Sequence, residues 1–460
     1  MKHSHVLLSV GIILALSILP AQSQQNNSND RSQQVKWFTD AKFGLFVHWG
    51  LYSQAAGVWR GIPARGGEHF MLYERVALND YAKIADDFNP VNYNAEEWVK
   101  TLKRAGMKYI VYTTKHHEGF AMYDSKSSDY NIVARTPFKR DPLKELADAC
   151  KKEGIKLGLY YSLGRDWEDP DVPTKNCWRS NIWDFRREDE KVIQRYLDRK
   201  VYPQLKELLT NYGDIAILWF DTPELVTKEQ SQALLDYIYS IQPNCLVNDR
   251  VGNDLGDYDT KEMQLADNIN HKPWELCLTM GGNWGYNKFD VYYKTPETII
   301  RYFTDVLSKG GNTLLNVGPT DKGDFPIFTT PIIEALHVWM EENGEAVYGT
   351  RPWKTFGETY KGIVSKEVFS KDAYSTLPKD NIPDFRFTAK GKNVYIIVRG
   401  IKELNYTVAS FQPSDKVKSV SLLGDTRKVA WKQTNAGLDI TIPEMSPARV
   451  PVYVLKAELK

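Results

Sequence analysis

Polar and titratable residues stand at the ends of successive apolar segments in the first 350 residues of the chain. The clearest example is Asp221, a carboxylate that directly follows the apolar run 215–220. The full set comprises His48, Trp49, His116, His117, Tyr161, Asp221, Arg250 and Glu275. Each has a structural explanation when taken alone: Asp221 as a helix cap, for example, or Arg250 as half of a loop ion pair. Together they predict one catalytic site.

Two carboxylates in an aromatic, histidine-rich pocket are the groups that a retaining glycosidase needs. One attacks the anomeric carbon, and the other protonates the leaving oxygen and later deprotonates water. Asp221 is the candidate nucleophile, Arg250 the partner that keeps it ionised, and Glu275 the candidate acid/base. No metal site is expected, because adjacent strand residues point in opposite directions and the pair His116–His117 would clamp an ion poorly.

The segments that must position these residues alternate between strand-like and helix-like composition. Strands are predicted at 43–50, 108–117, 156–162, 215–221, 245–250, 274–280 and 312–319, and helices at 94–106, 141–154, 182–211, 228–241, 295–309 and 331–345. Apolar residues on both faces are typical of parallel strands that helices cover. The pattern predicts a (β/α)8-like TIM barrel with one irregular unit and its site at the carboxyl ends of the strands. A doubly wound sheet is the alternative, but no glycine-rich phosphate-binding turn follows the first strand.

Two further regions flank the predicted catalytic domain at 24–349. Residues 350–460 show short alternating strands broken by Gly, Asn and Pro, which predicts a C-terminal antiparallel β-sandwich. This sandwich would either cap the barrel or bind carbohydrate, and the cap is favoured. Residues 1–23 predict a signal peptide, because a 14-residue apolar run precedes a small-residue cleavage site. That run is short of the ~20 residues that span a bilayer, so we expect an exported protein of a bacterial periplasm without membrane insertion.

Overall composition excludes some partners and agrees with others. The 59 Lys+Arg and 58 Asp+Glu residues give a formal net charge of +1, which argues against a nucleic-acid partner. The 13 Trp and 26 Tyr residues suit stacking on sugar rings as well as core packing. Four cysteines allow three disulfide pairings, and buried free thiols are the first interpretation. Oligomeric state is not predicted.

Several blocks of the sequence resemble the α-L-fucosidases of glycoside hydrolase family 29. In order between residues 36 and 347, they are WFTDAKFGLFVHWGLYS, YTTKHHEGFAMYDS, GLYYSLGRDW, LWFDT, NDR, WELCLTM with NWGYN, and LSKGGNTLLNVGP. The resemblance implies a (β/α)8-like barrel followed by a β-sandwich. It also implies retaining hydrolysis of terminal α-L-fucosyl linkages in oligosaccharides or glycans, without a metal or other cofactor. The linkage that is cleaved is not predicted.

The resemblance also implies roles for individual residues. Asp221 would be the nucleophile and Glu275 the acid/base, with Glu68, Glu118 and Glu224 as competitors for the second role. The residues implied to bind the sugar are His48, Glu68, His116, His117, Tyr161, Arg250 and Trp284, and Trp49 at the end of the first strand joins them as a candidate. Glu68 departs from the family pattern, since His69 and Phe70 follow it where the family has Trp-Tyr. A fucose-binding protein without catalysis and a metal-dependent hydrolase remain alternatives.

Overall fold

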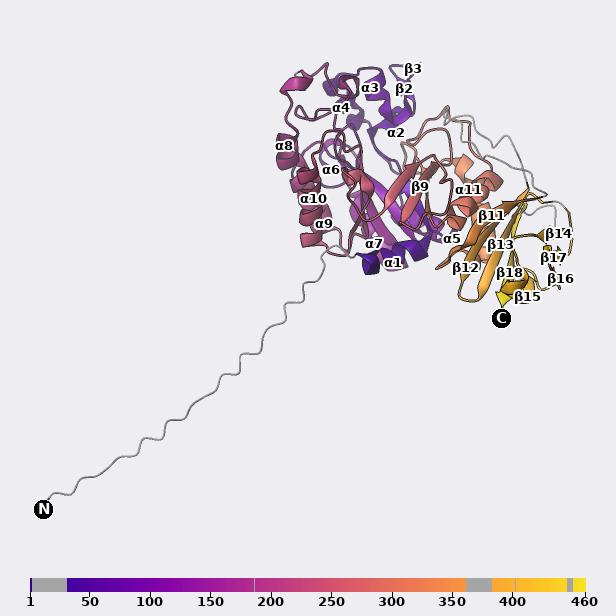
Figure 1. Cartoon of the computed structure of the whole chain (residues 1–460). Coiled ribbons are helices and arrows are strands. Elements are labelled where there is room, and N and C mark those ends of the chain that lie inside the picture. The colour runs from indigo at the N-terminus through magenta and orange to yellow at the C-terminus, as the bar shows by residue number, and fades with distance from the viewer. Residues whose placement is uncertain (2–30, 186, 361–382, 402, 445–449) are drawn as a thin grey trace.

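A computed structural model of the chain describes residues 1, 31–185, 187–360, 383–401, 403–444 and 450–460. Apart from Met1, the predicted signal peptide lies outside these residues. Among the helices of the described part, none has the length and apolar character to cross a membrane. The structure consists of an α/β barrel followed by a β-rich C-terminal domain (Figure 1).

Eight parallel strands form the barrel, in the order β7-β6-β5-β4-β1-β10-β9-β8. A single bridge between Asn248 and Tyr258 joins the two outer strands. The strands are β1 (Phe43–Val47), β4 (Tyr109–Lys115), β5 (Lys156–Ser162), β6 (Ile217–Asp221), β7 (Leu246–Val247), β8 (Asp259–Glu262), β9 (Trp274–Thr279) and β10 (Asn312–Val317). This arrangement confirms the predicted TIM-barrel-like fold.

β8 is the strand that the sequence pattern did not predict. Its sequence DTKE carries no apolar residue, and its side chains are half-buried or exposed. The chain runs from β8 to β9 through residues 263–273 without an intervening helix. Because no connecting helix covers the outer face of this strand, the strand does not need the apolar side chains that mark the others.

The longer helices follow the predicted ranges closely, with one exception. They are α5 (Ala95–Arg104), α7 (Pro142–Glu153), α9 (Tyr202–Asn211), α10 (Lys228–Ile241), α11 (Pro296–Ser308) and α12 (Thr330–Asn343). Another helix, α1 (Ser32–Ala41), precedes the first strand and was not predicted. Asn94 caps α5 by accepting a hydrogen bond from the backbone of Glu97, as the sequence indicated. The predicted helix 182–211 is wrong in its first third. Trp183 and Asp184 there hydrogen-bond to Val76 and Leu78, and α8 (Ile193–Tyr196) begins only afterwards.

Short elements complete the barrel domain. Among them are α2 (Leu51–Ala55), α3 (Phe70–Tyr73), α4 (Leu78–Ala82), α6 (Ile132–Arg135), the hairpin β2 (Val58–Trp59) and β3 (Ile62–Pro63), and the 3-10 turns η1 (Gly67–His69), η3 (Cys177–Arg179) and η6 (Asp249–Val251). Several of these lie in the loops that follow β1 and β5. Such loops at the carboxyl ends of barrel strands build the active site in this architecture.

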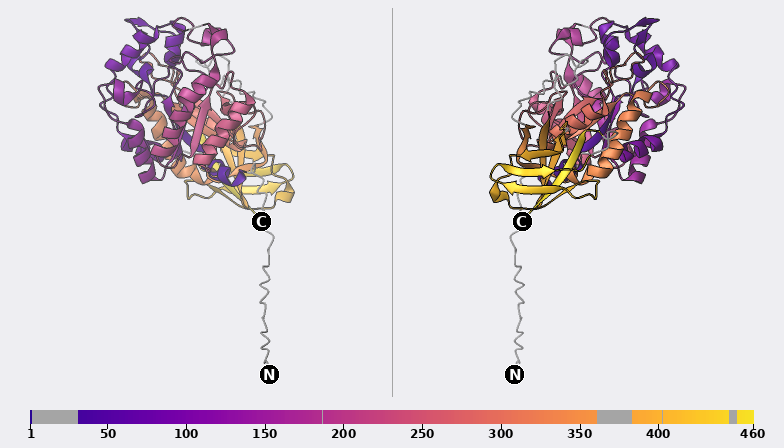
Figure 2. Two further views of the ribbon diagram at one scale, coloured as in Figure 1. Left: turned by 90° about the vertical axis from the view of Figure 1, so that its left-hand side faces the viewer. Right: turned by 90° about the vertical axis from the view of Figure 1, so that its right-hand side faces the viewer.

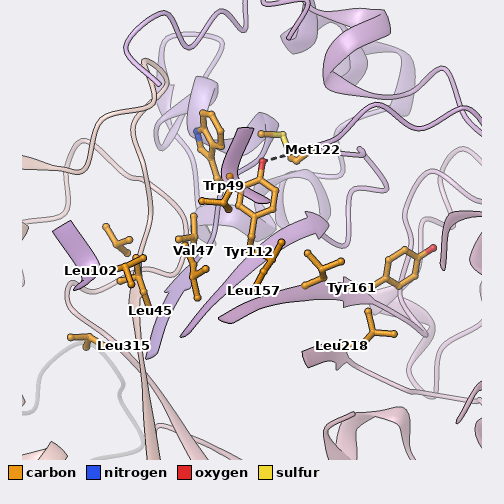
Figure 3. Close-up of a cluster of buried hydrophobic side chains, with 14 of the residues drawn as sticks. Leu45, Val47, Trp49, Leu102, Tyr112, Met122, Leu157, Tyr161, Leu218 and Leu315 are labelled. Carbon is orange, nitrogen blue, oxygen red and sulfur yellow. Dashed lines mark hydrogen bonds between the residues drawn. The ribbon is translucent and has the colours of Figure 1, made fainter. Parts of the chain in front are cut away.

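Alternate side chains of each barrel strand point to opposite sides of the strand. One set faces the helices and forms the larger core, with Leu45, Leu157, Leu218 and Leu315 among its members (Figure 3). The other set fills the barrel interior and includes Phe46, Val111, Tyr160, Ile217, Trp219, Cys277 and Leu314. Phe38 of α1 packs on Tyr258 at the amino ends of the strands, with ring centroids 4.5 Å apart. The interior is therefore closed at that end and can open only at the carboxyl ends.

The C-terminal domain is the predicted β-sandwich. One sheet has the order β11-β12-β13-β18-β15 and the other β14-β17-β16. The strands are β11 (Arg351–Thr359), β12 (Asp384–Lys390), β13 (Asn393–Arg399), β14 (Asn405–Val408), β15 (Val417–Leu422), β16 (Ala430–Thr434), β17 (Gly437–Thr441) and β18 (Val452–Leu459). The larger sheet contacts the barrel (Figure 2): Arg386 pairs with Asp305 of α11 at 2.7 Å, and the Trp339 indole of α12 donates to Val452 O. These contacts favour the interpretation of the sandwich as a cap.

The predicted domain boundary at 349–350 falls between the end of α12 and the start of β11. The cysteines are free in the described structure. Cys150, Cys245 and Cys277 are buried, as the first interpretation held, and Cys177 is exposed.

Candidate active site

A pocket of about 380 Å³ opens at the carboxyl ends of the barrel strands. Its lining residues are Phe46, His48, Glu68, His69, Leu72, Tyr73, His116, His117, Tyr160, Arg165, Trp178, Arg179, Trp219, Asp221, Thr222, Arg250, Glu262, Cys277 and Trp284. Its volume lies in the range of small-molecule sites. Seven of the ten sequence-predicted residues are in this lining; Trp49, Tyr161 and Glu275 are not.

Asp221 ends β6 and is held by hydrogen bonds on both carboxylate oxygens. Arg250 Nη1 donates to Oδ1 at 2.6 Å, and the Tyr160 hydroxyl donates to Oδ2 at 2.9 Å. Burial by itself would raise the pKa of Asp221, but the charge and hydrogen bond of Arg250, helped by Tyr160, lower it to about 2. Asp221 is therefore an ionised carboxylate at neutral pH, as a nucleophile must be.

Glu262 is a further carboxylate in the pocket, besides Asp221 and Glu68, and no sequence pattern had indicated it. It ends β8, its side chain is 45 % exposed, and Arg250 Nη2 donates to its Oε2 at 2.8 Å. One guanidinium thus bridges Asp221 and Glu262. Such a bridge is compatible with the roughly 5–5.5 Å that separates the carboxyl groups of retaining glycosidases. A sequence signal did exist. Only seven of the eight barrel strands were predicted, and the long gap between residues 250 and 274 left room for the eighth, whose carboxyl end would carry a site residue.

Glu275 does not occupy the position that the sequence analysis gave it. It is the second residue of β9, at the amino end of the barrel, and is fully buried. Its carboxyl group accepts hydrogen bonds from Tyr109 Oη at 2.5 Å and from Trp219 Nε1 at 3.0 Å. Because Trp219 itself lines the pocket, Glu275 lies beneath the pocket wall rather than in it. The prediction that Glu275 stands at a strand's carboxyl end is wrong.

Tyr161 and Trp49 also point away from the pocket, for a reason of strand geometry. Tyr161 faces the helices, where its hydroxyl donates to Gln204 Oε1 at 2.7 Å, and its neighbour Tyr160 faces the interior. Trp49 packs among aromatic side chains, and its indole donates to Thr320 O. Figure 3 draws both residues in the cluster that includes the outward-facing leucines. Both predictions of a place in the pocket are therefore wrong.

Three predicted histidines line the pocket together. His48 Nδ1 lies 2.7 Å from Asn316 Oδ1, and His117 Nδ1 lies 2.6 Å from Ser162 Oγ. The rings of His116 and His117 have centroids only 4.2 Å apart, although adjacent strand residues would diverge. They converge because β4 ends at Lys115 and both histidines lie in the turn that follows.

Burial holds these histidines in the neutral form. It lowers the pKa of His48 and of His116 to about 3, with contributions from neighbouring histidines, and lowers the pKa of His117 as well. Neutral imidazoles can donate to and accept from sugar hydroxyls. Nitrogen atoms of His69, His116 and His117 lie within 4.8 Å of one another, so these three residues are also the group that could hold a metal ion in the described part of the chain.

Glu68 and Trp284 line the pocket from two loops, as predicted. Glu68 Oε2 accepts from the backbone of Gly285 at 3.1 Å, and its Oε1 lies 3.1 Å from His69 Nδ1. Burial opposes ionisation of Glu68, but His69 and the Gly285 amide outweigh it and lower its pKa to about 2. The Trp284 ring lies 5.1 Å from that of His48 and offers an apolar face to the cavity.

The two other glutamates that competed for the acid/base role lie outside the pocket lining. Glu118 is fully buried beside His116, and Glu224 pairs with Arg165. The structure adds pocket residues that no sequence pattern indicated: Leu72 and Tyr73 from α3, Arg165, and Trp178 with Arg179 from η3. They come from irregular loops, where periodicity carries no signal.

Comparisons with known proteins agree with this geometry. The α-L-fucosidase family profile matches residues 15–345. Tissue α-L-fucosidase of Bos taurus is 30% identical over 441 residues, which cover 90% of this chain and 86% of that protein. α-L-Fucosidase isoenzyme 1 of Paenibacillus thiaminolyticus has a TM-score of 0.77 at 34% identity, covering 94% of this chain and 99% of that one.

A third relative has been solved with a ligand. α-L-Fucosidase AlfC of Lactobacillus casei, in complex with α-L-fucose, has a TM-score of 0.63 at 39% identity and covers 68% of this chain and 99% of its own. The family profile spans well over half of the present chain, and the relatives align along most of it. The chain therefore belongs to the α-L-fucosidase family of glycoside hydrolases.

Proposed function

We propose that the protein is an exo-acting α-L-fucosidase that removes terminal fucose from oligosaccharides or glycans with retention of configuration. The observation that carries the proposal is the pair Asp221 and Glu262, bridged by Arg250 at the open end of the barrel. Phe46, Trp219 and Cys277 are buried in the barrel interior and close the floor of the pocket. A glycan can therefore enter only by one end, which restricts cleavage to a terminal residue.

The two carboxyl groups divide the reaction between them. Asp221 attacks the anomeric carbon of fucose while Glu262, in its protonated form, donates its proton to the departing glycosidic oxygen. The resulting fucosyl-enzyme has inverted configuration at that carbon. Glu262 then takes a proton from water, the water displaces Asp221, and fucose leaves with its original configuration. Arg250, which pairs with both groups in the structure, keeps Asp221 charged for the first step.

The remaining predicted residues bind the sugar in this account. His48, His116, His117 and Glu68 supply hydrogen-bonding groups for the hydroxyls of fucose. Trp284 covers its apolar face and methyl group. Tyr160 takes the place that the sequence analysis assigned to Tyr161, since it is Tyr160 whose hydroxyl meets Asp221.

Hydrolysis of 4-nitrophenyl α-L-fucopyranoside, followed by NMR of the first sugar released, tests the proposal. We expect the α-anomer of fucose to appear first and to mutarotate later. The β-anomer appearing first would contradict double displacement. Isothermal titration calorimetry with fucose tests the alternative of a fucose-binding protein without catalysis. Such a protein would bind fucose tightly and release no nitrophenol from the substrate.

A metal-dependent hydrolase on the same scaffold would use His69, His116 and His117 as ligands. The double displacement needs no metal, because the two carboxyl groups and Arg250 supply the nucleophile, the proton and the charge. We expect dialysis against a chelator to leave kcat/KM unchanged. Loss of activity that zinc restores would favour the metal-dependent alternative.

We also propose that the protein is exported to a bacterial periplasm, with residues 1–23 as its signal peptide. The basic start, the apolar run and the small residues at 21–23 support this. Expression of the full chain in a bacterial host, with mass spectrometry of the periplasmic fraction, should yield a protein that begins after residue 23. Retention of the intact N-terminus in the cytoplasm would contradict it.

A further inference from the structure

Two aromatic side chains at the pocket lining are exposed, although most of the lining is buried. Trp178 is 53% exposed and Tyr73 is 48% exposed. They belong to different loops, η3 after β5 and α3 after β1. A large ring kept in contact with water at the edge of a site is a feature of binding surfaces. The proposed mechanism gives neither residue a task.

Both rings are attached to the buried wall of the pocket. The Arg179 guanidinium lies 4.9 Å from the Trp178 ring, and the Trp167 indole donates to Arg179 O at 3.0 Å. Arg179 also lies 3.8 Å from Glu224, three residues after Asp221. On the other loop, the Tyr73 ring lies 6.5 Å from that of His69. The exposed rings thus continue outward from the residues that surround the bound sugar.

We propose that Trp178 and Tyr73 form a subsite for the leaving group, and that this leaving group is a neutral pyranose sugar. The inference rests on the proposed function, because fucose in the closed interior directs its glycosidic bond toward the mouth. A pyranose ring has a face of C–H groups that stacks on an indole or phenol ring. Arg179 adds donors for the hydroxyl or acetamido oxygens of such a sugar.

The test compares two substrates that differ in the leaving group. α-L-Fucosyl fluoride loses a single atom, whereas a fucosylated N-acetylglucosamine disaccharide loses a pyranose. For Trp178→Ala, kcat/KM on the disaccharide should fall about tenfold more than on the fluoride, because only the disaccharide loses a stacking contact. Tyr292→Ala is the matched control, since Tyr292 is 67% exposed and lies outside the pocket lining; it should alter neither rate.

Equal losses on both substrates, or no loss on either, would overturn the subsite. This outcome is distinct from failure of the proposed function, in which the wild-type protein would hydrolyse neither substrate. Tyr73→Ala gives an independent second variant from the other loop, and it should show the same difference between substrates.

A second inference concerns Glu118, a fully buried carboxyl group behind the pocket. Its Oε2 lies 3.4 Å from Nδ1 of His116. Within the described structure, neither oxygen of Glu118 nor Nδ1 of His116 has a hydrogen-bond partner. Unpartnered buried polar atoms are rare, and a small rotation of either side chain would let these two, only 3.4 Å apart, share a proton.

The surroundings of Glu118 favour its neutral form. Burial is the main cause, Asp166 adds to it, and together they raise the pKa of Glu118 to about 8 against the opposing charge of Lys115. The phenols of Tyr52, Tyr81 and Tyr130, whose pKa values are raised in part by Glu118, complete its surroundings. His116 is also neutral, so its Nδ1 can accept a hydrogen bond.

We infer that Glu118 is a positioning residue whose O–H donates to Nδ1 of His116 and so keeps the imidazole proton on Nε2. That proton is then available to a sugar hydroxyl, and this role again rests on the proposed function.

The comparison of Glu118→Gln with Glu118→Leu tests this role. Glutamine keeps an N–H donor toward His116, so kcat/KM should stay within about threefold of wild type, whereas leucine should lower it at least about tenfold. A glutamine variant as impaired as the leucine variant, or a leucine variant as active as wild type, would overturn the inference.

Discussion

Two carboxyl groups point into the same barrel from its opposite ends, and their neighbours give them different charge states. Asp221 stands at the carboxyl end, where Arg250 helps to lower its pKa to about 2. Glu275 stands at the amino end, where burial raises its pKa to about 7 despite hydrogen bonds from Tyr109 and Trp219. Both groups are buried on the same face of their strands. The main cause of this difference is the Arg250 guanidinium, helped by the Tyr160 hydroxyl at Asp221.

Trp219 connects the two ends. Its ring stacks on Tyr160 at 5.6 Å, lies 4.9 Å from the Arg250 guanidinium, and donates its N–H to Glu275. Glu275, at the amino end of the barrel, therefore orients Trp219, which forms part of the pocket wall next to Asp221 at the carboxyl end. Catalysis and support are therefore separated along the barrel axis, in agreement with the placement of active sites at the carboxyl ends of the strands in this architecture.

The largest expected effect on activity comes from removing the Asp221 carboxylate at the carboxyl end of the barrel. Asp221→Gly should lower kcat on an aryl α-L-fucoside about 10⁴-fold, because it removes the group that forms the covalent bond. Added azide should restore turnover and yield the β-fucosyl azide, which mass spectrometry and NMR identify. Substantial activity without azide would contradict the assignment of the nucleophile.

Removal of the second pocket carboxylate should have the next largest effect. Glu262→Ala should lower kcat/KM on a fucosylated disaccharide about 10³-fold, since the leaving sugar needs a proton. An activated aryl fucoside should lose much less in its first step. Azide should accelerate turnover and give the α-fucosyl azide; absence of any azide effect would show that Glu262 is only a binding residue.

Loss of the Arg250 guanidinium should raise the pKa of Asp221 toward the raised value of Glu275 at the amino end of the barrel. Arg250→Met should lower kcat/KM about 100-fold and raise the pKa of Asp221, because burial then acts with less opposition. The acid limb of the kcat/KM profile should move to higher pH than in wild type. An unchanged acid limb would mean that Arg250 does not control the charge of Asp221.

The smallest effect on activity is expected at the amino end of the barrel. Glu275→Gln should keep kcat/KM within about tenfold of wild type on every fucoside, and azide should not matter. The substitution should instead change how the stability of the fold depends on pH. A carboxyl group raised from 4.5 to about 7 stabilises the fold fully below pH 4.5 and loses that contribution as the pH rises through 7.

Thermal melts across this range measure the second part of that prediction. The wild-type midpoint should fall between pH 4.5 and pH 7, and the midpoint of Glu275→Gln should fall less. If Glu275→Gln no longer hydrolyses the disaccharide but regains turnover with azide, Glu275 is the acid/base. That result would contradict the division between a catalytic Asp221 and a structural Glu275.

The sequence was sufficient for the parts of the fold with a strong apolar pattern. Seven strands, the main helices and the sandwich follow from it, and so does Asp221 at the end of β6. β8 escaped because no connecting helix covers its outer face, and its polar residues include Glu262. Because β8 was not predicted, Glu262, the second member of the candidate catalytic pair, was not predicted either.

Two further errors came from position along a strand. Tyr160 and Tyr161 are both tyrosines, and sequence alone cannot tell which of two alternating faces points into the barrel. His116 and His117 would have diverged on a strand, but β4 ends one residue earlier and both enter the pocket. The ends of elements are the least predictable feature of a sequence, and they are where a barrel places its site.

Trapping of the fucosyl-enzyme tests the central claim most directly. A 2-deoxy-2-fluoro-α-L-fucosyl fluoride should inactivate the protein with time, and peptide mass spectrometry should find the label on Asp221. Glu262→Ala should still accept the label, because fluoride needs little help to leave. A label on Glu262 or Glu68, or none at all while substrate is hydrolysed, would contradict the double displacement at Asp221.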